Sequence, residues 1–253
     1  MVRAKYNQPP IEEAICQLIL TQRLPWESDT PRRLFEKLRD RYPAMPTQQQ
    51  LLQANLTPPA IGTEAPGLSL APTERVIFAD TEDRSRLSVG PQTIGIHRAR
   101  PYIGFDEDML PRIKHDTTVV IESVQENPSF SGISVRYINK IEVEDATELE
   151  LKDYFNYGST AEALPSGFDG IVTGFFYRTA AKQSSSPLTL TLNFGSLAAP
   201  KDKAAFILDI DLGYTFEEPA ETGEAIAKIV EVKAMENSIF ESLITDTTRE
   251  LFK

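Results

Sequence analysis

The sequence is poor in the residues that build disulfides and metal sites. Its 253 residues include one cysteine, Cys16, and two histidines, His97 and His115. A single cysteine excludes an intramolecular disulfide, and no His-x-x-x-His or Cys-x-x-Cys spacing is present. No apolar run approaches the ~20 residues that span a bilayer, and residues 1–10 hold no apolar secretion signal. We therefore expect a cytoplasmic protein without a metal, another cofactor or membrane contact.

Positive charge is also scarce. Aspartate and glutamate number 37 against 26 lysines and arginines, which gives a net charge of -11. Such a chain is repelled by phosphate backbones, so we do not expect nucleic acid as a partner. The densest basic segment, residues 32–41, also contains Glu36 and Asp40 at helical spacing. This pattern is typical of a solvated helix face with salt bridges.

The first half of the chain predicts a strand, a helix, an irregular segment, a meander and a long helix. Aliphatic residues 11–20 predict a strand, and Thr30-Pro31 followed by an apolar stripe predicts a helix. The prolines of residues 43–66 predict an irregular surface segment that could hold a short helical turn at 48–53. Four short strands and a long helix are then expected, near residues 67–70, 75–80, 85–89, 93–98 and 106–125.

The second half has the same order of elements. Residues 132–143 alternate strictly, with Ile133, Val135 and Tyr137 on one face, and this pattern predicts a strand. The further elements expected are a short helix at 148–155, strands at 171–178, 188–194 and 204–212, a hairpin tip at 182–187, and a long helix at 222–251.

This order predicts an α+β protein of two similar halves, residues 1–128 and 129–253. The most economical arrangement is one continuous, curved antiparallel sheet with the two long helices on its concave face. The halves would then be a pseudo-duplication, with residues 11–20 and 133–143 as equivalent first strands. The TATA-binding-protein-like and helix-grip folds are the nearest analogies, and a fold analogy implies no function.

Three segments resemble an uncharacterised, sporadically distributed bacterial family of similar length. They are the opening Tyr6-Asn7-Gln8-Pro9-Pro10-Ile11-Glu12-Glu13-Ala14-Ile15-Cys16, then Tyr42-Pro43, and Arg136-Tyr137-Ile138-Asn139-Lys140-Ile141. Pro101-Tyr102-Ile103-Gly104-Phe105 departs from the family pattern, because Phe105 stands where a tryptophan is common. The resemblance implies no chemistry. It implies an accessory role, since some scattered genes of this kind lie beside defence or toxin–antitoxin genes.

No catalytic constellation is expected, because phosphate loops and Gly-x-Ser-x-Gly elbows are absent. Cys16 and the two histidines are expected to be structural, although His97 stays among the binding candidates. Strand alternation places Arg136 on the face opposite Tyr137, where it could hold Glu12 or Glu13 if the first strands lie together. The candidates for binding a partner or ligand are Arg136, Tyr137, Asn139, Tyr102 and His97.

These features favour a non-enzymatic protein that binds another protein. It would be an accessory or adaptor subunit of a bacterial cytoplasmic complex, tied to defence or regulation. Its binding surface would be the edge of the sheet or the proline-rich residues 43–66. The alternative is a small-ligand-binding or sensor protein with a pocket between the sheet and the long helices. A hydrolase with scattered carboxylates ranks lowest.

Overall fold

The computed structural model describes residues 6–57, 67–124, 128–144, 149–158, 173–200 and 202–253. Within them, nine strands form one sheet. The strands are β1 (Ile11–Leu20), β2 (Thr47–Thr57), β3 (Gly67–Asp80), β4 (Ser85–Val89), β5 (Thr93–Ala99), β6 (Phe130–Val143), β7 (Phe176–Lys182), β8 (Leu188–Leu197) and β9 (Ala204–Ala220). The helices are α1 (Thr30–Leu38), α2 (Leu110–Val124), α3 (Leu151–Tyr154), α4 (Thr222–Leu243) and α5 (Asp246–Glu250), with a π-helical turn η1 (Phe105–Met109) before α2.

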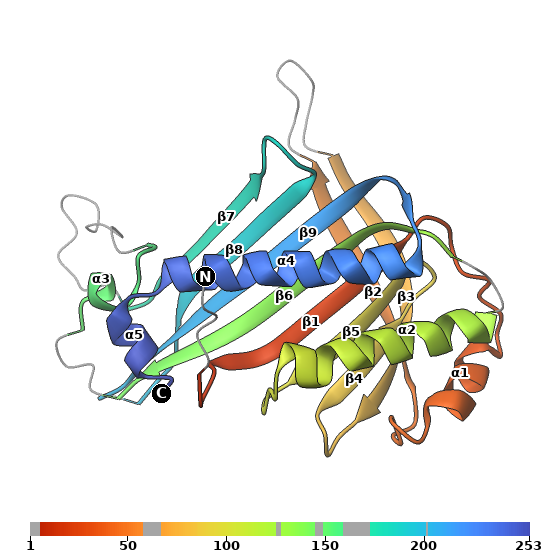
Figure 1. Ribbon diagram of the computed structural model, residues 1–253, viewed down its shortest axis with the longest axis horizontal. Coiled ribbons are helices and arrows are strands. Elements are labelled where there is room, and N and C mark those ends of the chain that lie inside the picture. The colour runs from red at the N-terminus through yellow and green to blue at the C-terminus, as the bar shows by residue number, and fades with distance from the viewer. Residues whose placement is uncertain (1–5, 58–66, 125–127, 145–148, 159–172, 201) are drawn as a thin grey trace.

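The sheet is antiparallel and runs in the order β2-β3-β4-β5-β1-β6-β9-β8-β7. The first strands of the two halves pair at its centre, where Ile15 lies opposite His97 on one side and Arg136 on the other. The sheet is therefore continuous across both halves (Figure 1). The predicted α+β class and the large antiparallel sheet are confirmed.

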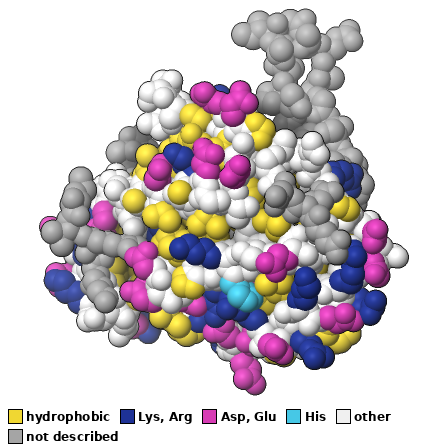
Figure 2. Space-filling view, turned by 45° about the vertical axis from the view of Figure 1, so that its right-hand side comes forward, with side chains coloured by type: hydrophobic (Ala, Val, Ile, Leu, Met, Phe, Trp, Pro, Cys, Tyr) yellow, Lys and Arg dark blue, Asp and Glu magenta, His cyan; other side chains and the backbone are white. Residues whose placement is uncertain are grey.

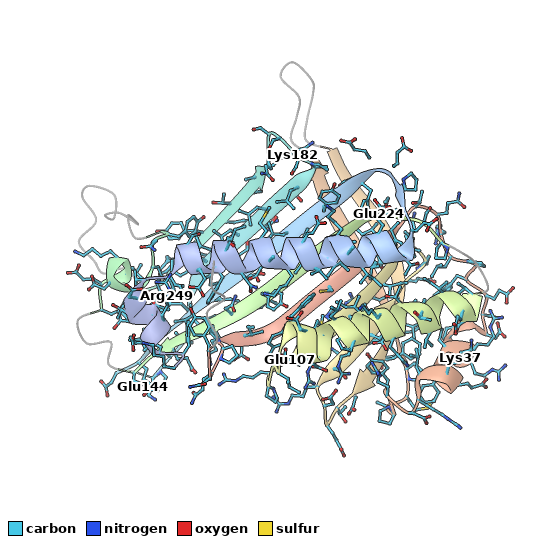
Figure 3. All side chains as sticks on the ribbon, viewed as in Figure 1. Lys37, Glu107, Glu144, Lys182, Glu224 and Arg249 are labelled. Atoms are coloured by element: carbon cyan, nitrogen blue, oxygen red, sulfur yellow. The ribbon has the colours of Figure 1, made fainter. Side chains whose placement is uncertain are left out.

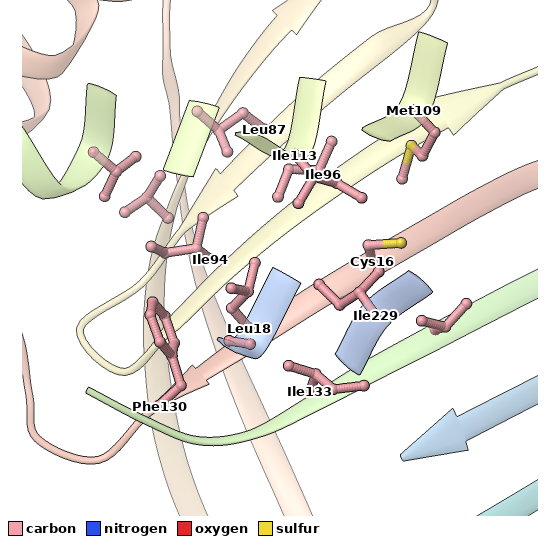
Figure 4. Packing of buried hydrophobic residues seen from close by; sticks show 14 of the residues in the cluster. Cys16, Leu18, Leu87, Ile94, Ile96, Met109, Ile113, Phe130, Ile133 and Ile229 are labelled. Atoms are coloured by element: carbon pink, nitrogen blue, oxygen red, sulfur yellow. The ribbon is translucent and has the colours of Figure 1, made fainter. Parts of the chain in front are cut away.

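The helices α2 and α4 cross the same face of the sheet (Figure 1). Alternation on β6 directs Val135 and Tyr137 under them, as predicted, and both side chains are buried. Figure 4 shows how Leu18 of β1, Ile113 of α2 and Ile229 of α4 meet in one apolar cluster. Because each such side chain contributes about 1.5–3 kcal/mol when fully buried, this shared core holds the two halves together.

Cys16 lies at the centre of this core and is fully buried. Burial raises the pKa of its thiol to about 12, because the thiolate would have to exist away from water. The lone cysteine is therefore a small core residue, as the sequence indicated.

The structure corrects the interpretation of residues 43–66 and joins the two short strands predicted at 67–70 and 75–80 into the single strand β3. Residues 47–57 form the strand β2, which pairs with β3 from Thr47 opposite Ile77 to Thr57 opposite Gly67. The proline-free composition of β2 permits this ladder, whereas the prolines around it had favoured an irregular segment. β3 also continues through Pro72, which lies beyond the described pairing with β4 at Val76–Asp80. Residues 58–66 lie outside the described residues.

The predicted carboxyl-terminal helix is wrong in its length. α4 ends at Leu243 because Ile244 adopts an extended backbone, with φ of -111° and ψ of 154°, and its fully buried side chain joins a second core cluster. Ile244 forms a bridge with Phe155, and Thr245 then caps α5 by accepting a hydrogen bond from the backbone of Thr248. Other boundaries shift as well, since β7 begins at Phe176 and the short helix α3 begins at Leu151.

Candidate functional site

The five residues singled out from the sequence fall on opposite faces of the sheet. Tyr102, Tyr137 and Asn139 lie on the face covered by the helices. His97 and Arg136 lie on the other face, which we call the open face because no long helix covers it in the described part of the chain. The open face presents Glu13, Gln17, Arg86, His97, Ser134, Arg136, Asp209, Asp211, Phe176 and Arg178. The candidates therefore do not form a single site.

The covered group forms a closed polar network under α4. The hydroxyl oxygens of Tyr102 and Tyr137 lie 2.8 Å apart, and Asn139 donates hydrogen bonds to backbone carbonyl oxygens. The ammonium of Lys233 sits 3.6 Å from the centroid of the Tyr137 ring and 2.5 Å from a carboxylate oxygen of Glu236. Burial raises the pKa of Tyr137 well above its ordinary value. The side chains of Tyr137 and Asn139 are almost completely shielded from water, and Tyr102 is partly buried against Tyr137, so we assign these residues a structural role.

Arg136 is held within the fold. Its Nε and Nη2 atoms each lie 2.8 Å from one carboxylate oxygen of Asp209, in a bidentate pair. Asn193 donates a further hydrogen bond to Asp209 at 2.9 Å. The expectation that Arg136 pairs with Glu12 or Glu13 is wrong, although β1 and β6 do lie together. Asp209 on β9 provides the carboxylate instead.

Glu13 belongs to a second polar group on the open face. Its carboxylate accepts from Arg86 and lies 3.0 Å from Nδ1 of His97. Burial disfavours the charged form of Glu13, but the hydrogen bond from His97 and the charge of Arg86 outweigh it and lower the pKa below the ordinary 4.5. His97 and Glu13 therefore stabilise each other on the open face.

We expect the difference in unfolding free energy between the protein and its Glu13→Gln variant to depend on pH, because only the unchanged protein has this carboxylate. Because the folded state lowers the pKa of Glu13, its charge stabilises the native protein above pH 4.5, and that contribution disappears as the pH falls through the folded-state pKa. At pH 7 the variant should lose about 1.5 kcal/mol. Urea unfolding of both proteins across this pH range measures the difference. A stability difference between the two proteins that stays constant with pH would contradict the role assigned to the Glu13 charge. In a His97→Gln background, Glu13→Gln should cost less stability.

A cleft of about 480 Å³ opens between α1, α2 and the turn that joins β3 to β4. Figure 2 brings the α1 side of the molecule forward and shows basic and acidic side chains crowded together there. We call this hollow the α1–α2 cleft. Its lining consists of Lys37, Asp40, Arg41, Asp80, Asp83, Arg112 and His115.

A buried carboxylate organises one wall of the cleft. Asp116 of α2 is fully buried, accepts a hydrogen bond from the hydroxyl of Tyr42 at 2.5 Å, and lies 3.4 Å from Nη1 of Arg41. The Nδ1 atom of His115 lies 2.9 Å from the same carboxylate. Burial and the nearby carboxylate raise the pKa of Tyr42, so its hydroxyl remains a donor. Asp116 therefore orients both Arg41 and His115 toward the cleft.

The opposite wall rests on a square of two arginines and two aspartates. Arg98 of β5 is only 2% exposed and lies 2.8 Å from both Asp83 and Asp108. Arg112 of α2 pairs with the same two aspartates, at 2.6 Å from Asp108. The square joins β5, the turn after β3, η1 and α2. It fixes the relative positions of the elements that carry the cleft.

Sequence reasoning missed this cleft. The interpretation of residues 32–41 as a salt-bridged helix face holds for Arg32, which pairs with Glu36 at 2.7 Å, and not for Lys37 and Arg41, which line the cleft. The cleft could not be predicted from a local pattern, because its other lining residues come from segments far away in the sequence. Glu36 and Asp40 indicated a mixed-charge surface there, and of these two Asp40 lines the cleft.

The strand β7, at one edge of the sheet, is highly exposed to solvent. Six of its seven residues are exposed to solvent, and one of these, Phe176, is 64% exposed. Phe176, Arg178 and Lys182 point to the open face, since they lie opposite Gly195, Asn193 and Thr189 of β8. Figure 3 labels Lys182 at the end of this strand. Among the described residues, neither Arg178 nor Lys182 has an ion-pair partner.

Among the described residues, no group of three or more His, Cys, Asp or Glu side chains could hold a metal ion. None of the helices that these residues form is long and apolar enough to cross a membrane. Comparison with known protein families finds no matching family model, and comparison with curated proteins finds no significant match.

Proposed function

We propose that the protein is a non-enzymatic accessory subunit that binds another protein along β7. The observation that supports this function is the exposed edge strand itself. A terminal strand presents unpaired backbone N–H and C=O groups, and an added strand from a partner extends such a ladder. Phe176 supplies an exposed aromatic anchor of the kind that dominates binding energy at protein interfaces. An accessory role also agrees with the family resemblance of the sequence.

The partner segment should be extended and acidic. Arg178 and Lys182 are four residues apart on one face of β7, so they match two acidic side chains at the same spacing on a partner strand. These two cations stand out on a chain whose net charge is -11. Complementary charge at this edge would select an acidic strand and disfavour pairing between two copies of β7.

Charge reversal on β7 tests the proposal. We expect the double variant Arg178→Glu, Lys182→Glu to lose at least about tenfold in affinity for a purified partner, because two attractions become repulsions. The partner is obtained by cross-linking and capture from native cells, and its affinity for each variant is measured with purified proteins. Phe176→Ser should weaken binding as well. The matched control is Arg32→Glu with Arg39→Glu, two exposed cations on and beside α1, which packs against α2 and β3.

Three outcomes count against the proposal. The first is that capture returns only further copies of this chain, which would identify a self-association site. The second is that the control variant weakens binding as much as the β7 variant does. The third is that the β7 variant lowers the melting temperature instead of the affinity, which would show that these cations stabilise the fold of this chain.

We also propose that the two halves are pseudo-duplicated. Reading outward from the central β1–β6 pair, the sheet continues through β5, β4 and β3 on one side and through β9, β8 and β7 on the other. A long helix follows β5 in the first half and β9 in the second. By this correspondence β7 is the equivalent of β3, and β2 is the additional strand that extends the first half.

Ligand binding is the second candidate function, and the α1–α2 cleft favours it. The cleft does not lie between the sheet and the long helices, where the apolar cluster around Leu18 and Ile229 fills the space. Its lining is charged rather than apolar. A ligand in this cleft would therefore be held by ion pairs more than by hydrophobic burial.

A further inference from the structure

We propose that the α1–α2 cleft binds a small zwitterionic molecule. Lys37 and Arg41 would hold its anionic group, a carboxylate or a phosphate, and Asp40 and Asp80 would face its ammonium group. The proposal deepens the ligand-binding candidate and is independent of partner binding at β7.

The cleft offers cationic donors that the fold has not used. Among the described residues, Lys37 has no ion-pair or hydrogen-bond partner. Arg41 uses only Nη1, toward Asp116 at 3.4 Å, and its side chain stays 33% exposed. A guanidinium carries five N–H donors, so most of those on Arg41 are free to bind a carboxylate or phosphate.

Acceptors are available in the same cleft. Asp40 has no partner in the described part of the chain, and it lies between Lys37 and Arg41 in the sequence. Asp80 uses Oδ1 to accept from two backbone N–H groups of the following turn, which leaves Oδ2 unbonded there. Carboxylate oxygens in this state are good partners for an ammonium group.

Two other charged side chains of the cleft lining, Asp83 and Arg112, already have ion-pair partners. Asp83 pairs with both Arg112 and the buried Arg98, and Arg112 also pairs with Asp108, so Asp83 and Arg112 add little net field to the cleft. A simple anion would be attracted by Lys37 and repelled by Asp40. A simple cation would be attracted by Asp40 and repelled by Lys37. A molecule with both charges satisfies both sets of groups. Its opposite charges largely cancel, so an acidic chain repels it less than it repels a simple anion.

The walls of the cleft are preorganised for such a ligand. The fully buried Asp116 fixes Arg41 and His115, and the buried Arg98 fixes the turn that follows Asp80 through its ion pair with Asp83. The volume of about 480 Å³ lies within the range of ~300–1,000 Å³ that is usual for small-molecule sites. A free amino acid or a phosphoethanolamine-sized molecule fits this space.

Binding of defined probes to the purified full chain tests the proposal. The zwitterionic probes are the free L-α-amino acids and phosphoethanolamine, and the single-charge controls are acetate, inorganic phosphate and ethylamine. We expect at least one zwitterion to bind at millimolar or lower concentration, and at least about tenfold more tightly than every single-charge control. Isothermal titration calorimetry measures the affinities, and the rise in melting temperature provides an independent readout.

Variants locate the site. Lys37→Ala and Asp40→Asn should each weaken binding of the best zwitterion about tenfold, because each removes one of the two side chains that face its anionic or its ammonium group. Arg32→Ala is the matched control, since Arg32 lies on α1 and pairs with Glu36 outside the cleft. The double β7 variant should bind the zwitterion normally, and Lys37→Ala should bind a protein partner normally. This separates failure of one function from failure of the other.

Three results would overturn the zwitterion proposal. One is that no zwitterion binds or raises the melting temperature. Another is that inorganic phosphate binds as tightly as any zwitterion, which would identify an anion site. The third is that Asp40→Asn leaves the affinity for the best zwitterion unchanged.

Discussion

Replacing Arg98 by alanine is expected to lower the free energy of unfolding by about 3–5 kcal/mol. Its guanidinium is almost completely shielded from water and neutralises Asp83 and Asp108 at 2.8 Å each. Removing one partner of a buried charge pair leaves the other charges without compensation, which costs far more than the loss of a surface salt bridge. Arg112 would then have to balance two carboxylates alone.

Urea unfolding of Arg98→Ala at pH 7, followed by circular dichroism, measures this loss. Arg100→Ala is the matched control, because Arg100 follows two residues later in the chain, is half exposed, and pairs with Glu12 at 3.1 Å. We expect the control to lose less than about 1 kcal/mol. Similar losses in the two variants would show that the square of charges around Arg98 does not stabilise the fold.

Asp116→Ala is expected to have the second large effect. The substitution removes the acceptor of the buried Tyr42 hydroxyl and the partner of Arg41 and His115. An unsatisfied buried hydroxyl costs about 1–3 kcal/mol by itself, and a cavity in place of the carboxylate adds to this. We therefore expect a total loss of about 3 kcal/mol.

A double-mutant cycle with Tyr42→Phe measures the direct link between these two residues. The coupling free energy between Tyr42 and Asp116 should lie between about 0.5 and 3 kcal/mol, as for other residues in contact. Asp116→Asn keeps the shape of the side chain and an acceptor oxygen, so it should lose less stability than Asp116→Ala. Additive effects of the two single variants would mean that the short hydrogen bond contributes nothing.

The parts of the fold that were predicted well have a strong local signal. The strict alternation along β6 and the Thr30-Pro31 start of α1 needed no knowledge of their neighbours. β2 was missed because its glutamines and leucines lack a clear two-residue pattern, and pairing with β3 decides its structure. Ile244 was missed because a buried contact with Phe155 overrides helical spacing at that position.

The contacts that define the sites depend on strand order, which local patterns do not contain. Alternation placed Arg136 on the correct face, but β6 lies between β1 and β9, and each neighbour carries acidic residues. Glu13 and Asp209 both lie opposite Ile138, but Glu13 is engaged by Arg86 and His97, and Arg136 binds Asp209. The α1–α2 cleft is even harder to predict, because its lining residues come from α1, α2 and the turn between β3 and β4.

The central pairing of β1 with β6 also affects how the chain is made. β1 can pair with β5 as soon as the first half has left the ribosome, but its other edge belongs to β6, which follows only after α2. Until then, Cys16 and Leu18 lack the apolar neighbours that Ile133 and Ile229 later supply. The nascent protein thus exposes both a strand edge and half of a core. A translational pause before β6 would prolong the period in which it can aggregate.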